Sequence, residues 1–123
     1  NYQARNYLKT MVPGDQAFVY HSNATPSGVV GLARVTRSGV LDPTQFDPAS
    51  PYFDPKSTIE SPRWTTVEVA HVQTFPRLVS LAVLKATFTP DEMPVVKRGQ
   101  RLSVLPVADT AAERLLEMAT IGA

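Results

Sequence analysis

The chain has 123 residues, no cysteine and a formal net charge of +1 at neutral pH, which fits one domain with a core of its own. The lack of cysteine excludes a disulfide scaffold, a thiolate nucleophile and a cysteine-based zinc site. No apolar run approaches the roughly 20 residues that cross a bilayer and no signal peptide opens the chain, so we expect a soluble, cytoplasmic protein without membrane contacts.

Residues 1–11 are predicted to form a helix, because their apolar side chains recur on one face. The sequence Pro-Gly-Asp at 13–15 ends that helix in a turn. Residues 18–35 then organise the chain as two strands around a turn, since strand formers begin at Phe18 and residues 24–28 have turn chemistry.

The second of these strands, residues 29–35, is apolar on both faces and is therefore expected to be buried on both sides. Gly31 within it indicates a bend or a close approach by another group. We expect Ser38 and Gly39 to break this strand.

Residues 42–64 contain five of the eleven prolines and resemble a linker in composition. Phe46, Tyr52, Phe53 and Ile59 are poor residues for a solvated tether, so we predict an ordered excursion that these side chains pin across the fold.

The remaining elements are a strand over 64–75 that Pro76 ends, a short helix over 81–86 capped by Ser80, a last strand over 101–107 and a helix over 110–119. Thr110 and Glu113 have the spacing of a capping box for the last helix.

Catalytic motifs are weak. His21 and Ser22 are neighbours on a strand and are predicted to point to opposite faces, which argues against a base–nucleophile pair. His71 is distant in sequence, and the two histidines have no familiar metal spacing. We therefore expect no enzyme, metal site or cofactor. A hydrolase or transferase acting on a small molecule or nucleotide in the same pocket is the alternative.

Recognition of a base outside a duplex needs aromatic surface, polar groups for the base edge and cations for phosphates. Tyr20 and Trp64 are candidates for stacking, although either is also consistent with a core aromatic. Residues 97–101, KRGQR, are consistent with a solvated turn or with a phosphate contact.

Several motifs in fixed order resemble the EVE domain family over nearly the whole chain. They are NYQARN (1–6), FxYHSN (18–23), GVVG (28–31), DPTQFDP (42–48), YxDPKS (52–57), PRW (62–64), RLSV (101–104) and PV (106–107). The resemblance implies an α+β, PUA-like fold, a mixed and strongly bent β-barrel flanked by short helices and related to the YTH readers. It implies one domain over 1–123 that lacks, or does not show, the family's first strand.

The same resemblance implies a monomeric, non-enzymatic reader of a modified nucleobase, either methylated or hydroxymethylated cytosine in DNA or a base in modified RNA. Its pocket would lie beside the central hairpin. The residues that match the family's pocket positions are Asn1, Gln3, Arg5, Asn6, Tyr20, His21, Ser22, Asn23, Arg63 and Trp64.

Overall fold

The computed structural model describes residues 2–121. In chain order the elements are α1 (Tyr2–Thr10), β1 (Gln16–His21), β2 (Gly28–Leu41), β3 (Thr65–Ser80), α2 (Leu81–Thr87) and α3 (Asp109–Ile121). Two short 3-10 helices, η1 (Pro43–Phe46) and η2 (Pro94–Val96), lie in the connections. No helix among the described residues has the length and apolar character needed to span a membrane.

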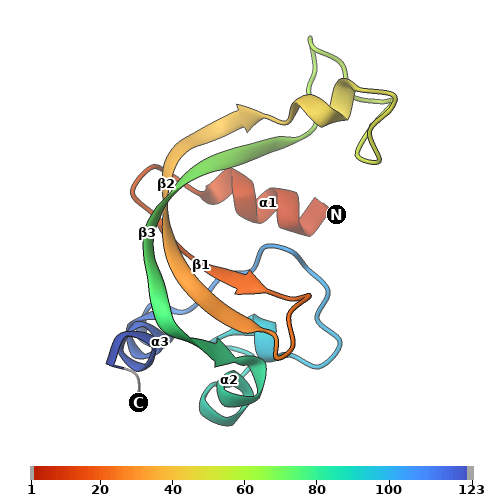
Figure 1. Cartoon of the computed structure of the whole chain (residues 1–123). Coiled ribbons are helices and arrows are strands. Elements are labelled where there is room, and N and C mark those ends of the chain that lie inside the picture. The colour runs from red at the N-terminus through yellow and green to blue at the C-terminus, as the bar shows by residue number, and fades with distance from the viewer. Residues whose placement is uncertain (1, 122–123) are drawn as a thin grey trace.

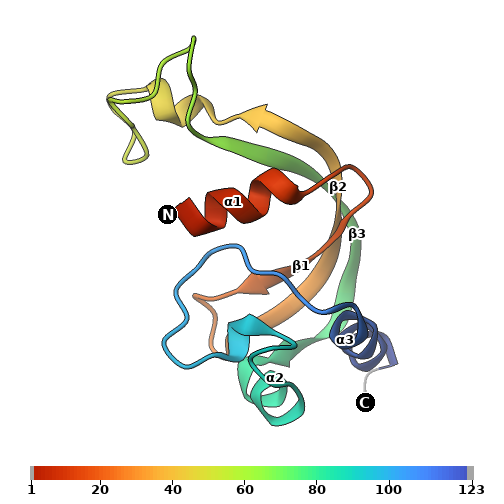
Figure 2. The same ribbon diagram turned by 180° about the vertical axis from the view of Figure 1, so that it is seen from behind.

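The strands form one antiparallel sheet in the order β1-β2-β3. Strands β2 and β3 curl together into an open C (Figure 1). Helix α1 lies inside the curve. Helices α2 and α3 pack at the end of the hairpin where β2 begins and β3 ends, as the reverse view also shows (Figure 2). The predicted α+β class, with a strongly bent sheet and flanking short helices, is confirmed.

Two predicted strand ends are wrong, because the chain absorbs both breakers as irregularities within a longer hairpin. Strand β2 continues through Ser38 and Gly39 to Leu41, with a register shift between Arg37 and Val40 and a φ of 65° at Gly39. Strand β3 continues through Pro76, which is tolerated because β3 pairs with β2 on one edge only.

The close approach predicted at Gly31 is confirmed. A Cβ atom on Gly31 would lie 2.6 Å from the carbonyl oxygen of Gln73 on the neighbouring strand. A side chain at this position would therefore push the β2 and β3 backbones apart.

The core lies between the start of β2 with the end of β3 and the segments that follow β3 along the chain. Its buried members are Val29, Leu32, Phe75, Val79, Leu84, Phe88, Met93, Val96, Ala111, Leu115 and Ala119. The apolar faces of β2, β3, α2 and α3 thus account for the rigid base of the fold.

The predicted helices at both ends and the Ser80 cap are confirmed, since the Ser80 side chain accepts a hydrogen bond from the Val83 amide. The predicted capping box is wrong, because α3 begins at Asp109 and places Thr110 inside its first turn. The predicted strand over 101–107 is also wrong: this segment is irregular and no described strand pairs with it.

Candidate functional site

A stacked aromatic pair joins the start of α1 to the start of β3. The rings of Tyr2 and Trp64 have centroids 5.5 Å apart and planes inclined by 15°. Tyr2 is 52% exposed, and Trp64 is half-buried and lies outside the core cluster. An exposed aromatic surface of this kind is suited to stacking against a flat ligand.

Two guanidinium groups lie against these rings. The Arg5 guanidinium carbon is 4.6 Å from the Tyr2 ring centroid and 5.4 Å from that of Trp64, and Arg63 lies over Tyr2 at 5.6 Å. Arg63 also donates a hydrogen bond to the Tyr2 hydroxyl. The Nε of Arg5 is buried and has no hydrogen-bond partner among the described residues. The site therefore holds a desolvated donor that no residue described by the structure uses.

A single carboxylate anchors this aromatic-cationic cluster. Asp54 accepts a 2.8 Å hydrogen bond from the Trp64 indole and pairs with Arg63 at 3.3 Å. The indole hydrogen bond lowers the pKa of Asp54, and a bond from the Lys56 amide and the Arg63 charge lower it further. Asp54 is thus held ionised, and it fixes the rotation of the indole ring.

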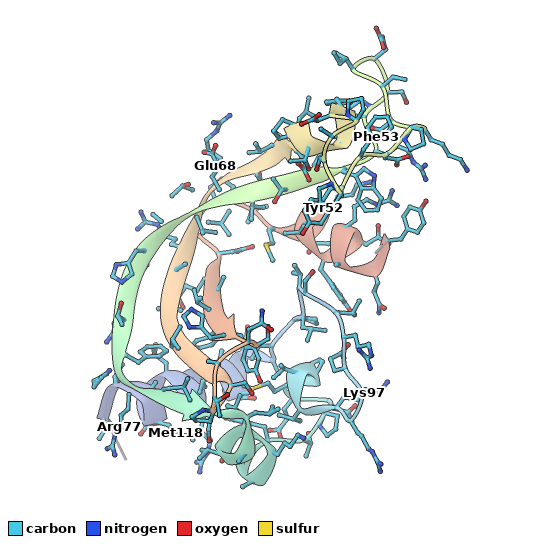
Figure 3. The ribbon with its side chains drawn as sticks, turned by 45° about the vertical axis from the view of Figure 1, so that its right-hand side comes forward. Tyr52, Phe53, Glu68, Arg77, Lys97 and Met118 are labelled. Carbon is cyan, nitrogen blue, oxygen red and sulfur yellow. The ribbon has the colours of Figure 1, made fainter. Side chains whose placement is uncertain are left out.

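The cluster rests on residues 42–64, which project from the far end of the β2–β3 hairpin (Figure 3). The prediction that aromatics pin this segment across the fold is wrong. Tyr52 and Ile59 are 72% and 74% exposed, and Phe53 is also exposed. The segment is ordered instead by polar contacts around one fully buried side chain, Gln45.

Gln45 satisfies the loop backbone from within. Its Nε2 donates to the carbonyl oxygens of Asp42 and Trp64, at 2.7 and 2.8 Å. Its Oε1 accepts from the amides of Arg63 and Trp64 and from the Ser57 hydroxyl. These contacts set the position from which Arg63 and Trp64 reach α1.

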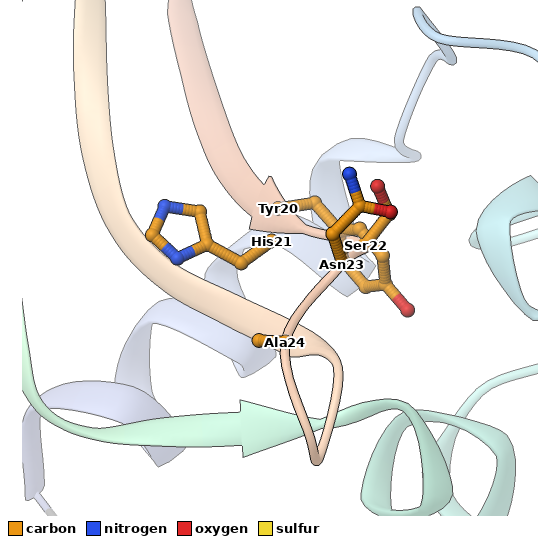
Figure 4. Close-up of a pocket in the computed structure, with 5 residues that line it drawn as sticks. All are labelled: Tyr20, His21, Ser22, Asn23 and Ala24. Atoms are coloured by element: carbon orange, nitrogen blue, oxygen red, sulfur yellow. The ribbon is translucent and has the colours of Figure 1, made fainter.

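A separate open cavity of about 400 Å³ lies at the end of β1 and is lined by residues 20–24. Tyr20 is held by a hydrogen bond from its hydroxyl to Ser27. Figure 4 shows His21 directed away from Tyr20, Ser22 and Asn23, as strand alternation predicts. His21 and Ser22 are therefore not arranged as a base and its nucleophile in this conformation.

The structure brings some predicted site residues together and separates others. Arg5, Arg63 and Trp64 meet in the aromatic-cationic cluster, whereas residues 20–23 line the cavity at β1. Gln3 donates to the Tyr7 hydroxyl, and Asn6 is exposed on α1. Asn1 lies outside the described residues.

Sequence reasoning missed Tyr2, Asp54 and Gln45. A signal for Tyr2 was present, because it stands three residues before Arg5 and thus shares its face of α1. Asp54 and Gln45 carried no such signal, since their roles depend on how a proline-rich loop folds back on itself.

Comparison with known proteins places the chain in a family. Residues 1–118 match the EVE domain. The chain belongs to the EVE domain family. The resemblance stated from the motifs is thereby confirmed, and it extends over almost the whole chain.

Relatives of this EVE domain include thymocyte nuclear protein 1 from Homo sapiens and from Mus musculus, both 37% identical over 125 residues. The alignments cover 96% of the chain and 56% and 55% of those proteins. The chain thus spans about half the length of these curated relatives.

Solved structures include a protein from Pseudomonas putida, with a TM-score of 0.89 and 45% identity over 97% of this chain and 80% of that one. The human thymocyte nuclear protein 1 in complex with 5-methylcytosine-containing DNA has a TM-score of 0.83 and 36% identity, covering 97% and 74%. The EVE domain therefore shares its fold with a protein that has been solved on modified DNA.

Proposed function

We propose that this EVE domain binds DNA that carries a modified cytosine and distinguishes the modified base from the unmodified one. The observation that carries the proposal is the likeness to human thymocyte nuclear protein 1, whose structure contains 5-methylcytosine DNA. The likeness to that protein amounts to 36% identity over 97% of the chain, with a TM-score of 0.83.

In this proposal the modified base leaves the DNA stack and enters the cavity at the end of β1. The Ser22 hydroxyl and the Asn23 amide can both donate and accept hydrogen bonds, as the edge of a pyrimidine requires. The Tyr20 ring supplies apolar wall, and its bond to Ser27 limits its motion. The end of β1 thus offers both the apolar surface and the hydrogen-bonding groups that recognition of a base needs.

The aromatic-cationic cluster is assigned to the neighbouring nucleotides. Tyr2 offers an exposed ring for a base, and Trp64 supports it from behind in the stack. Arg5 carries the buried unpaired Nε, and a phosphate or base oxygen close to it would supply the missing acceptor. Within the cluster, Gln45 and Asp54 hold Trp64 in place through hydrogen bonds to its backbone and its indole.

A hydrolase or transferase that uses the same cavity has less support. His21 points away from Ser22, and neither histidine contacts an acidic residue in the part of the chain that the structure describes. We therefore propose binding without turnover as the function.

The proposal is tested by equilibrium binding to matched DNA duplexes that carry cytosine, 5-methylcytosine or 5-hydroxymethylcytosine at one position, with a methylated RNA of the same sequence alongside. We expect tighter binding to a modified DNA than to its unmodified counterpart, and a loss of that preference in Asn23→Ala. Equal affinity for all the DNAs would overturn the proposal, and so would a preference confined to RNA. Turnover of a nucleotide would support the enzyme instead.

A further inference from the structure

We propose that the turn Lys97-Arg98-Gly99-Gln100-Arg101, here called the basic turn, is a phosphate-binding site for the DNA strand beside the modified base. The inference rests on the proposed function for its ligand and adds a binding site outside both the β1 cavity and the aromatic-cationic cluster. Three of its five residues are cationic, none is acidic, and all three cationic residues are exposed.

The basic turn has a defined backbone conformation that hydrogen bonds hold in place. It follows η2, whose Val96 is 7% exposed and belongs to the core cluster. The Lys97 amide bonds the Pro94 carbonyl at 3.0 Å, and the Gln100 amide bonds the Lys97 carbonyl at 3.1 Å. Gly99 turns the chain with a φ of 76°.

The Gln100 side chain closes the turn from inside. Its Nε2 donates to the Pro94 carbonyl, and its Oε1 accepts from the amides of Arg101 and Leu102. Gln100 therefore faces its own backbone and leaves the exposed positions to Lys97, Arg98 and Arg101. An anchored backbone reduces the entropy lost when such side chains bind a phosphate.

The position of the turn suits a strand that enters the cavity. Figure 3 shows Lys97 on the side toward which the curved sheet opens, and the same segment borders that opening in both ribbon views. Figure 4 shows Ser22 and Asn23 pointing away from His21. We place the backbone of a nucleotide bound in the cavity at the opening of the curved sheet, which the segment of the basic turn borders.

The other arginines of the site are largely occupied by contacts within the protein, with only the Nε of Arg5 unpaired among the described residues, so a further source of positive charge is informative. Arg63 pairs with Asp54, and Arg5 lies against two rings and bonds the Arg63 carbonyl. Elsewhere Arg37 pairs with Glu68 on the sheet. Exposed cations without acidic neighbours in sequence are the usual phosphate ligands, and such contacts position a protein without reading sequence.

The test uses the triple variant Lys97→Gln/Arg98→Gln/Arg101→Gln and a control with the same charge change, Arg77→Gln/Lys85→Gln/Arg114→Gln, drawn from exposed cations of β3, α2 and α3. Figure 3 shows Arg77 on the opposite side of the fold from Lys97. Kd for methylated and unmethylated duplexes is measured over a salt series, after melting curves confirm that both variants are folded.

We expect the basic-turn variant to lower the slope of log affinity against log salt by about 2–3, since each phosphate contact contributes about 0.9 on duplex DNA. Affinity for both duplexes should fall by a similar factor, leaving the methyl preference intact. An unchanged slope overturns the inference, as does an equal loss in the control. Loss of the methyl preference with an unchanged slope would mean that the turn reads the base, which also overturns it.

The two proposals fail in different ways. If the wild type shows no methyl preference, the proposed function fails, yet a reduced slope in the basic-turn variant alone would still identify the phosphate site. If the preference is present but the slope is unaffected, the function stands and the phosphate site fails.

Discussion

The Gln45 side chain forms hydrogen bonds with both backbone groups of Trp64. Its Oε1 accepts from the Trp64 amide at 3.0 Å, and its Nε2 donates to the Trp64 carbonyl at 2.8 Å. A side chain with no exposed surface thus supplements the one backbone hydrogen bond, from the Asp42 amide to the Trp64 carbonyl, that the loop makes here. The position of the indole ring, and of the cluster around it, follows from this pairing.

Gln45→Ala is therefore expected to loosen residues 42–64. Removing the amide leaves the Trp64 N–H without its acceptor, whereas the Arg63 N–H keeps the Ser57 hydroxyl and the Trp64 carbonyl keeps the Asp42 amide. An unpaired buried group costs about 1–3 kcal/mol. Urea unfolding should report the lower stability, and hydrogen exchange should speed up at the Trp64 amide. Thr58→Ala, in an exposed turn of the same segment, is the control. Unchanged exchange at the Trp64 amide in Gln45→Ala would contradict the role of Gln45.

Trp64 is expected to matter more for binding than for folding. It lies outside the core cluster, so Trp64→Ala should shift the melting temperature by only a few degrees, whereas losing the ring that supports Tyr2 in its stack with a base should weaken binding of methylated DNA roughly ten- to a hundred-fold. Trp64→Phe keeps a ring but removes the bond to Asp54, and we expect an intermediate affinity. A collapse of melting, or full affinity in a folded Trp64→Ala, would remove Trp64 from the site.

The sequence predicted elements better than it predicted their ends. Helical spacing located α1 and α3, and strand formers located β1 and β2, because burial of one face dominates those segments. Gly39 and Pro76 misled the prediction, since a long curved hairpin accommodates breakers at bulges and on an edge strand.

The site divides in the same manner. Arg63 and Trp64 were identifiable as a charged–aromatic pair, and Arg5 as a cation near the chain start. That all three meet, and that Tyr2 completes the stack, depends on Gln45 folding the loop toward α1. A lone buried glutamine in a polar, proline-rich loop has no periodic pattern by which sequence could reveal it.

Gly31→Ala is expected to destabilise the fold, because its Cβ atom would meet the Gln73 carbonyl oxygen at 2.6 Å in the centre of the hairpin. We expect a loss of about 1–3 kcal/mol in the free energy of unfolding, as for an overpacked interior site. Gly39→Asn is the control, since Gly39 has open space around it and asparagine tolerates its positive φ. Equal stabilities of the two variants, measured in urea, would be inconsistent with this close approach.

The Asp54 carboxylate should make stability depend on pH in the acidic range. Its pKa is lowered in the folded protein, so its contribution is present above the ordinary carboxyl pKa of about 4 and is lost as the pH falls through the lower folded value. The gap in unfolding free energy between the wild type and Asp54→Asn should therefore shrink below about pH 4. A gap that stays constant down to pH 2 would contradict this.

Glu92→Gln provides a matched comparison for Asp54→Asn. Hydrogen bonds from the Thr89 amide and hydroxyl lower the pKa of Glu92, so its contribution should be lost with acid in the same direction. Glu92 lies far from the aromatic-cationic cluster in sequence, and within the part of the chain that the structure describes no hydrogen bond or ion pair joins it to that cluster. Only Asp54→Asn should therefore change DNA binding at neutral pH. Equal effects of both variants on affinity would contradict a role of Asp54 in the DNA-binding site.

Base recognition is tested most directly by the fluorescence of Trp64, the only tryptophan in the chain, during titration with two duplexes that differ in a single methyl group. We expect a saturable change in emission at a lower concentration of the 5-methylcytosine duplex than of the cytosine duplex, at one fixed salt concentration. Superimposable titration curves, or no change in emission with either duplex while a labelled DNA still binds, would contradict a modified-base reader whose aromatic-cationic cluster contacts the neighbouring nucleotides.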